Sequence, residues 1–139
     1  MSVELFTGEC FFQAIPTANS ETVAAYFHQL AAHAPRSGAS SLTVVLDQNP
    51  THRQKMRAAL AALTPAIPVC FLLLAPYSPR LNPVEYLIHL IRLRLLHHAD
   101  PSQNLQQVQQ RLEENVHLKV WFSPQQLRNI LAHIDENTP

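Results

Sequence analysis

One stretch is predicted to lead from the end of a strand to the start of a helix: Leu72-Leu73-Leu74-Ala75-Pro76-Tyr77-Ser78-Pro79-Arg80-Leu81-Asn82-Pro83-Val84-Glu85. The leucines at its start are typical of the end of a buried strand. Each proline fixes φ and removes a backbone donor, so neither a helix nor a sheet continues through the middle of the stretch. Asn82 is a preferred N-cap and Pro83 suits the first helical position, so a helix begins there. The stretch therefore predicts a stiff loop that presents Glu85 in a first helical turn, where the macrodipole favours negative charge.

A parallel crossover is expected just before this loop. Residues 42–46 and 69–74 are short apolar runs, a pattern typical of strands buried on both faces. Asn49-Pro50 has the chemistry of a helix start, and the helix that follows is expected to place three side chains inward: Met56, Leu60 and Leu63. Strand, helix and strand in this order imply a right-handed crossover. Ligands gather outside the carboxyl ends of such strands, where Asp47 and the Tyr77 loop are expected.

The segments on either side predict a hairpin and further helices. Residues 3–6 and 10–15 are strand-like and flank Thr7-Gly8-Glu9, which indicates a β-hairpin. Asn19 or Ser20 caps a helix whose apolar face is formed by Val23, Phe27, Leu30 and Ala34.

Three more helices are expected after the central stretch. Residues 84–98 are apolar nearly all round, so their helix should be largely buried. Its exception is one polar stripe at positions i, i+4 and i+7, formed by Glu85, His89 and Arg92. Capping boxes at residues 100–103 and 123–126 predict two amphipathic packing helices.

Composition limits the classes of function. The chain has 139 residues, of which 47% are hydrophobic, so we expect one domain's worth of folded chain. Ten basic and ten acidic residues argue against a dedicated basic nucleic-acid-binding domain but permit a catalytic domain that touches DNA locally. Cys10 and Cys70 lie in apolar runs and are expected to be buried thiols. Without a signal peptide or a run long enough to span a membrane, the protein is expected to be cytoplasmic.

Asp47 and Glu85 are the candidate catalytic acids. One helix and one strand separate them, so they are able to meet in space. Hard divalent cations prefer carboxylate oxygens, and a pair of such ions activates a water and stabilises the leaving oxygen of a phosphodiester.

Each candidate also has an ordinary structural interpretation. Glu85 alone is a common first-turn glutamate, and His52 in a first turn is a common surface or capping residue. A solvated polar face accounts for His89 and Arg92. Three basic residues are either contacts to backbone phosphates or an exposed helix face: Arg53, Lys55 and Arg57.

Two blocks resemble signatures of the mariner-like DDE transposases, a group that includes many bacterial insertion-sequence transposases. Residues 74–85 resemble the block around the family's last acidic residue, which is a catalytic metal ligand. Residues 47–52 resemble the block around its second aspartate, with a histidine five residues later. The hairpin turn, the helix from Ser20, and Arg92 at a position where the family usually carries lysine also fit. The family's tryptophan after the glutamate is Ile88 here.

The resemblance implies an RNase H-like α/β fold and an endonuclease that binds transposon ends. It implies metal-dependent DNA strand cleavage and joining in transposition, a form of DNA recombination and integration. Asp47 and Glu85 are then catalytic metal ligands for Mg²⁺ or Mn²⁺. Accessory or DNA-contacting roles are implied for His52, Tyr77, Asn82, His89 and Arg92.

The resemblance also predicts how the chain is organised. Residues 1–98 are expected to form a partial RNase H-like catalytic domain, and residues 99–139 a C-terminal helical extension packed on it. The family's first aspartate lies on a strand before the hairpin. That central strand and a preceding helix-turn-helix are expected to be missing, so the chain alone is expected to be inactive or nearly so, with a weak or unoccupied metal site.

The missing strand would lie between the hairpin and the strand at 42–46. Its loss exposes sheet edges, so we expect a homodimer, an exchange of elements, or pairing with a separate N-terminal transposase fragment. One alternative is a non-catalytic transposase remnant that binds DNA or protein. Another is an unrelated α/β protein with a similar loop.

Overall fold

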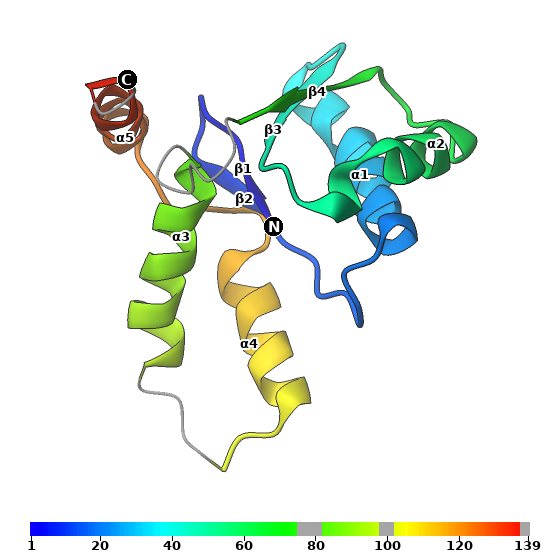
Figure 1. Cartoon of the computed structure of the whole chain (residues 1–139). Helices are drawn as coiled ribbons and strands as arrows, with labels where there is room; N and C mark the ends of the chain where they lie inside the picture. The colour runs from blue at the N-terminus through cyan, green and yellow to red at the C-terminus, as the bar shows by residue number, and fades with distance from the viewer. Residues whose placement is uncertain (75–81, 98–101, 137–139) are drawn as a thin grey trace. The chain divides into compact units, whose positions relative to one another are not determined.

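The computed structural model describes residues 1–74, 82–97 and 102–136, with side chains described up to residue 133 (Figure 1). The chain divides into two compact units, Ile15–Ser78 and Met1–Ala14 with Pro79–Pro139. The elements of the first unit are α1 (Ser20–His33), η1 (Ala34–Ser37), β3 (Leu42–Leu46), η2 (Pro50–His52), α2 (Gln54–Ala62) and β4 (Val69–Leu73). Those of the second are β1 (Ser2–Val3), β2 (Glu9–Phe11), α3 (Pro83–Ile91), η4 (Arg92–Leu96), α4 (Leu105–Val116), β5 (Lys119–Val120) and α5 (Pro124–Glu136).

The first unit is a parallel β-α-β crossover with an extra helix, α1. Strands β3 and β4 pair in parallel from Leu42↔Val69 to Leu46↔Leu73, as the sequence predicts. Helix α1 begins at the N-cap Asn19, whose side chain accepts from the Thr22 amide at 2.9 Å. Helices α1 and α2 pack against each other (Figure 1). Phe27 of α1 meets Phe71 of β4 edge to face. The two helices therefore cover one face of the β3-β4 sheet.

The opposite face of the β3-β4 sheet is exposed, so the expectation of strands buried on both faces is wrong. Val45 is 39% exposed and its register partner Leu72 is 59% exposed. Cys70, expected to be buried, lies exposed beside Thr43 on the same face. An apolar run identifies strands that tolerate burial, but it does not supply the second layer that would cover them.

The segment after β3 is a short 3₁₀ turn followed by α2, and not one continuous helix. The Asn49 side chain caps the turn η2 and accepts from the Thr51 amide at 3.0 Å. Arg53 is extended, which separates η2 from α2. In α2, Met56 and Leu60 are buried as predicted, whereas Leu63, expected to point inward, is 42% exposed.

The second unit contains the predicted hairpin and a strand that the sequence analysis missed. Strands β1 and β2 pair antiparallel, and β5 pairs antiparallel with the other edge of β2, giving the order β1-β2-β5. The predicted strands were too long, since Glu4 bonds the amides of Phe6 and Thr7 and begins the turn early. Gly8 has φ +76°, and a Cβ there would lie 1.9 Å from the Phe122 carbonyl oxygen. The hairpin and the start of α5 therefore approach closely only because residue 8 is glycine.

Helix α3 is amphipathic, although its sequence is apolar nearly all round. Pro83, Leu87 and Ile91 are buried, while Leu93 in the π-helical turn η4 is 46% exposed. The predicted helix over 84–98 is therefore only partly buried, and residue 98 lies outside the described residues. The core that α3 joins consists of Cys10, Leu87, Ile91, Val116, Phe122 and Leu127.

The last two helices differ in how well their starts were predicted. Helix α4 begins at Leu105 with a capping box between Asn104 and Gln107, so the start expected at residues 100–103 is wrong. Helix α5 has the predicted box, in which the Ser123 amide donates to Gln126 Oε1 at 2.8 Å. No helix among the described residues is both long enough and apolar enough to cross a membrane.

Candidate active site

Asp47 lies directly after β3, and its carboxylate is held from one side. Oxygen Oδ1 accepts from Nδ1 of His52 at 2.8 Å and from the amide of Asn49 at 3.2 Å. The turn η2 brings His52 back toward Asp47, and His52 Nδ1 also lies 3.4 Å from the Asp47 carbonyl oxygen. Oδ2 has no partner among the described residues. The Asp47 side chain is 58% exposed, so Oδ2 remains available to a cation or a substrate.

The loop at Asp47 is tied to the end of the neighbouring strand. Gln48 donates from Nε2 to the carbonyl oxygen of Leu74 at 3.1 Å, just beyond β4. The Leu74 amide in turn donates to the Leu46 carbonyl oxygen at 2.8 Å. The carboxyl ends of β3 and β4 are therefore bonded together at the level of Asp47. The role of Gln48 is not predictable from the sequence, because it depends on the pairing of the two strands.

Glu85 is positioned by a capped helix start, and its carboxylate has no partner among the described residues. Asn82 Oδ1 accepts from the Val84 amide at 3.2 Å, and the Glu85 amide donates to the Asn82 carbonyl oxygen at 3.0 Å. Pro83 occupies the first helical turn, as predicted. The Glu85 side chain is exposed, which suits both a ligand and an ordinary first-turn glutamate.

The remaining predicted site residues divide into two groups. His89 and Arg92, which were predicted to share a stripe with Glu85, are exposed, and neither forms an ion pair with Glu85 in the described part of the chain. Tyr77 lies outside the described residues. The side chains of His89 and Arg92 are therefore accessible from solvent.

Asp47 and Glu85 belong to different units of the chain, Asp47 to Ile15–Ser78 and Glu85 to the other. Their convergence on one metal ion stays a prediction. Among the residues that the structure describes, no three His, Cys, Asp or Glu side chains form a group that could hold a metal ion.

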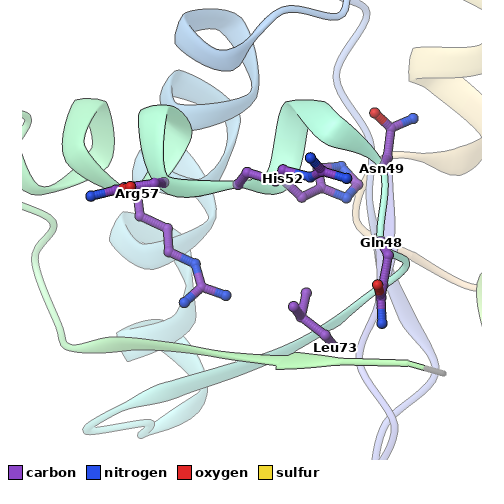
Figure 2. Close-up of a pocket in the computed structure, with 7 residues that line it drawn as sticks. Gln48, Asn49, His52, Arg57 and Leu73 are labelled. Carbon is purple, nitrogen blue, oxygen red and sulfur yellow. The ribbon is translucent and has the colours of Figure 1, made fainter. Parts of the chain in front are cut away.

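A pocket lies beside Asp47 on the same unit, between η2, α2 and the end of β4 (Figure 2). Its volume is about 330 Å³. The lining consists of Gln48, Asn49, His52, Arg53, Gln54, Arg57 and Leu73. His52 thus faces both this pocket and the Asp47 carboxylate. Sequence analysis singled out Arg53 and Arg57 as basic but had no signal that Leu73, from a strand, would join them.

Comparison with known proteins identifies a family to which the chain is similar. A family described as DDE superfamily endonuclease matches residues 1–124. The match includes both candidate acids and continues past residue 98, where the recognised motifs end, through α4 and β5 to the start of α5. No curated protein and no solved structure matches the chain.

Proposed function

The chain belongs to the DDE superfamily endonucleases, and we propose that it forms part of the catalytic domain of a mariner-like transposase. Membership implies an RNase H-like α/β fold, and the described residues are a mixture of helices and small sheets. Domains of this family generally bind DNA and use divalent metals. The proposed reaction is metal-dependent cleavage and joining of DNA strands during transposition. The proposal rests chiefly on Asp47, which lies at a strand end with one carboxylate oxygen fixed by His52 and the other uncommitted.

The residues present fit a hard divalent cation. Asp47 and Glu85 offer carboxylate oxygens, which Mg²⁺ and Mn²⁺ prefer, and both side chains reach solvent. Bound there, the ion would supply an activated water and stabilise the leaving oxygen of a phosphodiester. His52 would orient Asp47 through Oδ1 and leave Oδ2 for the metal, as residues behind metal ligands commonly do.

We further propose that the third acid of the active site comes from a polypeptide segment outside residues 1–139. A strand carrying it would pair with an available sheet edge. Among the described strands, β1 lies at the edge of its three-stranded sheet and β3 pairs with β4 alone, so each offers an edge. The segment belongs to the rest of a longer protein or to a separate N-terminal fragment. Residues 1–139 alone would then cleave DNA poorly or not at all.

A second function is binding without cleavage. The exposed face of the β3-β4 sheet carries Val45 and Leu72, and contiguous exposed apolar surface commonly marks contact with another protein. A transposase remnant that uses this face would bind transposase protomers or DNA-bound partners. It would need neither Asp47 nor Glu85.

Metal binding separates these two functions. Calorimetric titration of the chain with Mn²⁺ is expected to give one site that Asp47→Ala and Glu85→Ala each weaken about tenfold or more. Glu114→Ala is the matched control, because Glu114 is an acid on α4 that bonds Gln110 and lies outside the proposed site. Affinity that is the same in all four proteins would contradict the catalytic proposal.

Cleavage provides the complementary readout. Supercoiled plasmid incubated with the chain and Mg²⁺ or Mn²⁺ is expected to remain un-nicked, because one acid of the site is supplied from elsewhere. Vigorous nicking that depends on Asp47 and Glu85 would support the catalytic assignment but refute the need for a third acid. Light scattering adds the assembly state, with a dimer supporting self-pairing of the sheet edges.

A further inference from the structure

The pocket beside Asp47 carries positive charge that no acid of its lining offsets. Arg53 is the extended N-cap residue of α2 and Arg57 lies within the helix, and both side chains line the pocket. The lining contains no Asp or Glu, and neither arginine has an ion-pair partner among the described residues. Arg57 also lies 5.4 Å from the ring centroid of Phe71, which restrains its side chain. Two guanidinium groups therefore line the pocket, and contact with Phe71 restrains that of Arg57.

The neighbouring lysine behaves differently. Lys55 lies between the two arginines in sequence, but its Nζ contacts Oε1 of Glu21 at 2.8 Å and lies outside the pocket. The hydrogen bond from Lys55 lowers the pKa of the Glu21 carboxyl below its usual value. Lys55 is therefore paired with Glu21 of α1, whereas the guanidinium groups of Arg53 and Arg57 remain available to a ligand.

The pocket also has an apolar side. Leu73 at the end of β4 is 50% exposed and contributes to the lining. Figure 2 shows Leu73 between the Arg57 and Gln48 side chains, with Arg57 reaching from α2 toward the strands. Amide groups of Gln48, Asn49 and Gln54 complete the wall. A ligand that fits such a surface has an anionic group, an apolar ring or chain, and hydrogen-bonding atoms at the edge.

We propose that this pocket binds one sugar–phosphate unit of a DNA strand. Arg53 and Arg57 donate N–H bonds to the phosphate oxygens, a geometry for which guanidinium groups are suited, and Leu73 contacts the sugar. His52 lines the pocket and bonds Asp47, so a strand held here passes beside the Asp47 carboxylate. The inference rests on the proposed function, for which it names the backbone contact that holds the substrate.

Fluorescence anisotropy of a labelled oligodeoxynucleotide, titrated with the full chain in EDTA, tests the proposal. Arg53→Ala and Arg57→Ala are each expected to weaken binding about tenfold. Each should also lower the slope of log K against log salt by about 1. Lys55→Ala, which removes the same charge from the same helix outside the pocket, should change affinity less than twofold. Equal effects of all three substitutions would overturn the proposal, since a diffuse positive field would then account for binding.

Two further experiments control for loss of folding and for binding of phosphate alone. Arg57→Ala loses the contact to Phe71 as well, so Arg57→Lys and the exposed Arg53→Ala provide variants in which folding, checked by circular dichroism, is retained. A deoxynucleoside monophosphate is expected to displace the oligonucleotide at lower concentration than inorganic phosphate does. Equal displacement by both would show a plain phosphate site and overturn the sugar contact. Because EDTA removes metal, the failure of this proposal is distinguishable from failure of the Mn²⁺ site.

Discussion

The carboxylates of Asp47 and Glu85 are held in different ways by different units. Asp47 is oriented by a side chain, because His52 and the Asn49 amide both bond its Oδ1. Glu85 is placed by its helix start, through the Asn82 side-chain cap and the first turn of α3. The first arrangement fixes which oxygen is free, whereas the second fixes only where the side chain begins. Metal binding by Asp47 is therefore expected to depend on its neighbouring side chains, and metal binding by Glu85 on the integrity of its helix start.

The two glycines of the chain, one in each unit, compare a crowded backbone position with an open one. Gly8→Ala is expected to destabilise the unit that holds Glu85 by about 3–4 kcal/mol, because the residue has φ +76° and its Cβ would clash with the Phe122 carbonyl. Gly38→Ala, at φ +81° with open space around it, should cost only about 1–2 kcal/mol. Urea unfolding followed by circular dichroism measures both. Similar losses at the two positions would show that the close approach at Gly8 is not rigid.

Because of Cys10, the stability of the unit that contains Glu85 is expected to depend on alkaline pH. Burial raises the pKa of its thiol from 9.0 to about 11, so the folded chain keeps a proton that the unfolded chain releases. This contribution to stability is complete below pH 9 and is lost as pH rises toward 11, by up to about 2–3 kcal/mol. The free energy of unfolding of the native chain, minus that of Cys10→Ala, should fall over this range. A difference that stays constant would contradict the burial of the thiol.

His52→Ala sharpens the contrast between the two carboxylates. Losing the bond to Oδ1 should weaken Mn²⁺ binding about tenfold, because Asp47 then samples other rotamers. His89→Ala, the histidine on the helix of Glu85, should leave the affinity within twofold. Calorimetry on both variants provides the comparison. An equal effect at the two histidines would contradict the idea that Asp47 alone depends on a side-chain partner.

Asn82→Ala is the corresponding change for Glu85 and should have the smallest effect. Its side chain caps α3, and such a cap contributes about 1 kcal/mol. Asn19→Ala removes a cap of similar chemistry from α1 in the other unit and serves as the control for stability. Only Asn82→Ala should also reduce the affinity for Mn²⁺, and then only slightly. A metal affinity that falls equally in both variants would reflect general destabilisation.

Local chemistry accounts for what the sequence predicted correctly. Elements that depend on residues within a few positions of one another were predictable from the sequence. They include strand 42–46 and the helix caps at Asn19, Asn82 and Ser123. Strand β5 has only two residues and exists because it pairs with β2, more than a hundred positions away. The sequence carries little trace of such a partnership.

The candidate site shows the same division. The sequence offers both acids and His52 as candidates, since they occur in short recognisable blocks, but it did not predict the bond between His52 and Asp47. The pocket combines α2 with Leu73 of β4, so it appears only once the crossover is folded. The exposed face of the β3-β4 sheet was mispredicted because burial depends on a covering layer that residues 42–46 do not specify.

Asp47 and Glu85 are proposed to share one metal ion, and Mn²⁺ broadening of amide NMR signals tests this sharing most directly. As Mn²⁺ is added, signals near Asp47 and signals near Glu85 are expected to broaden together, with one apparent affinity. Asp47→Ala should abolish the broadening at both places. Broadening at one carboxylate alone, or at both with separate affinities that survive substitution of the other, would contradict the shared site.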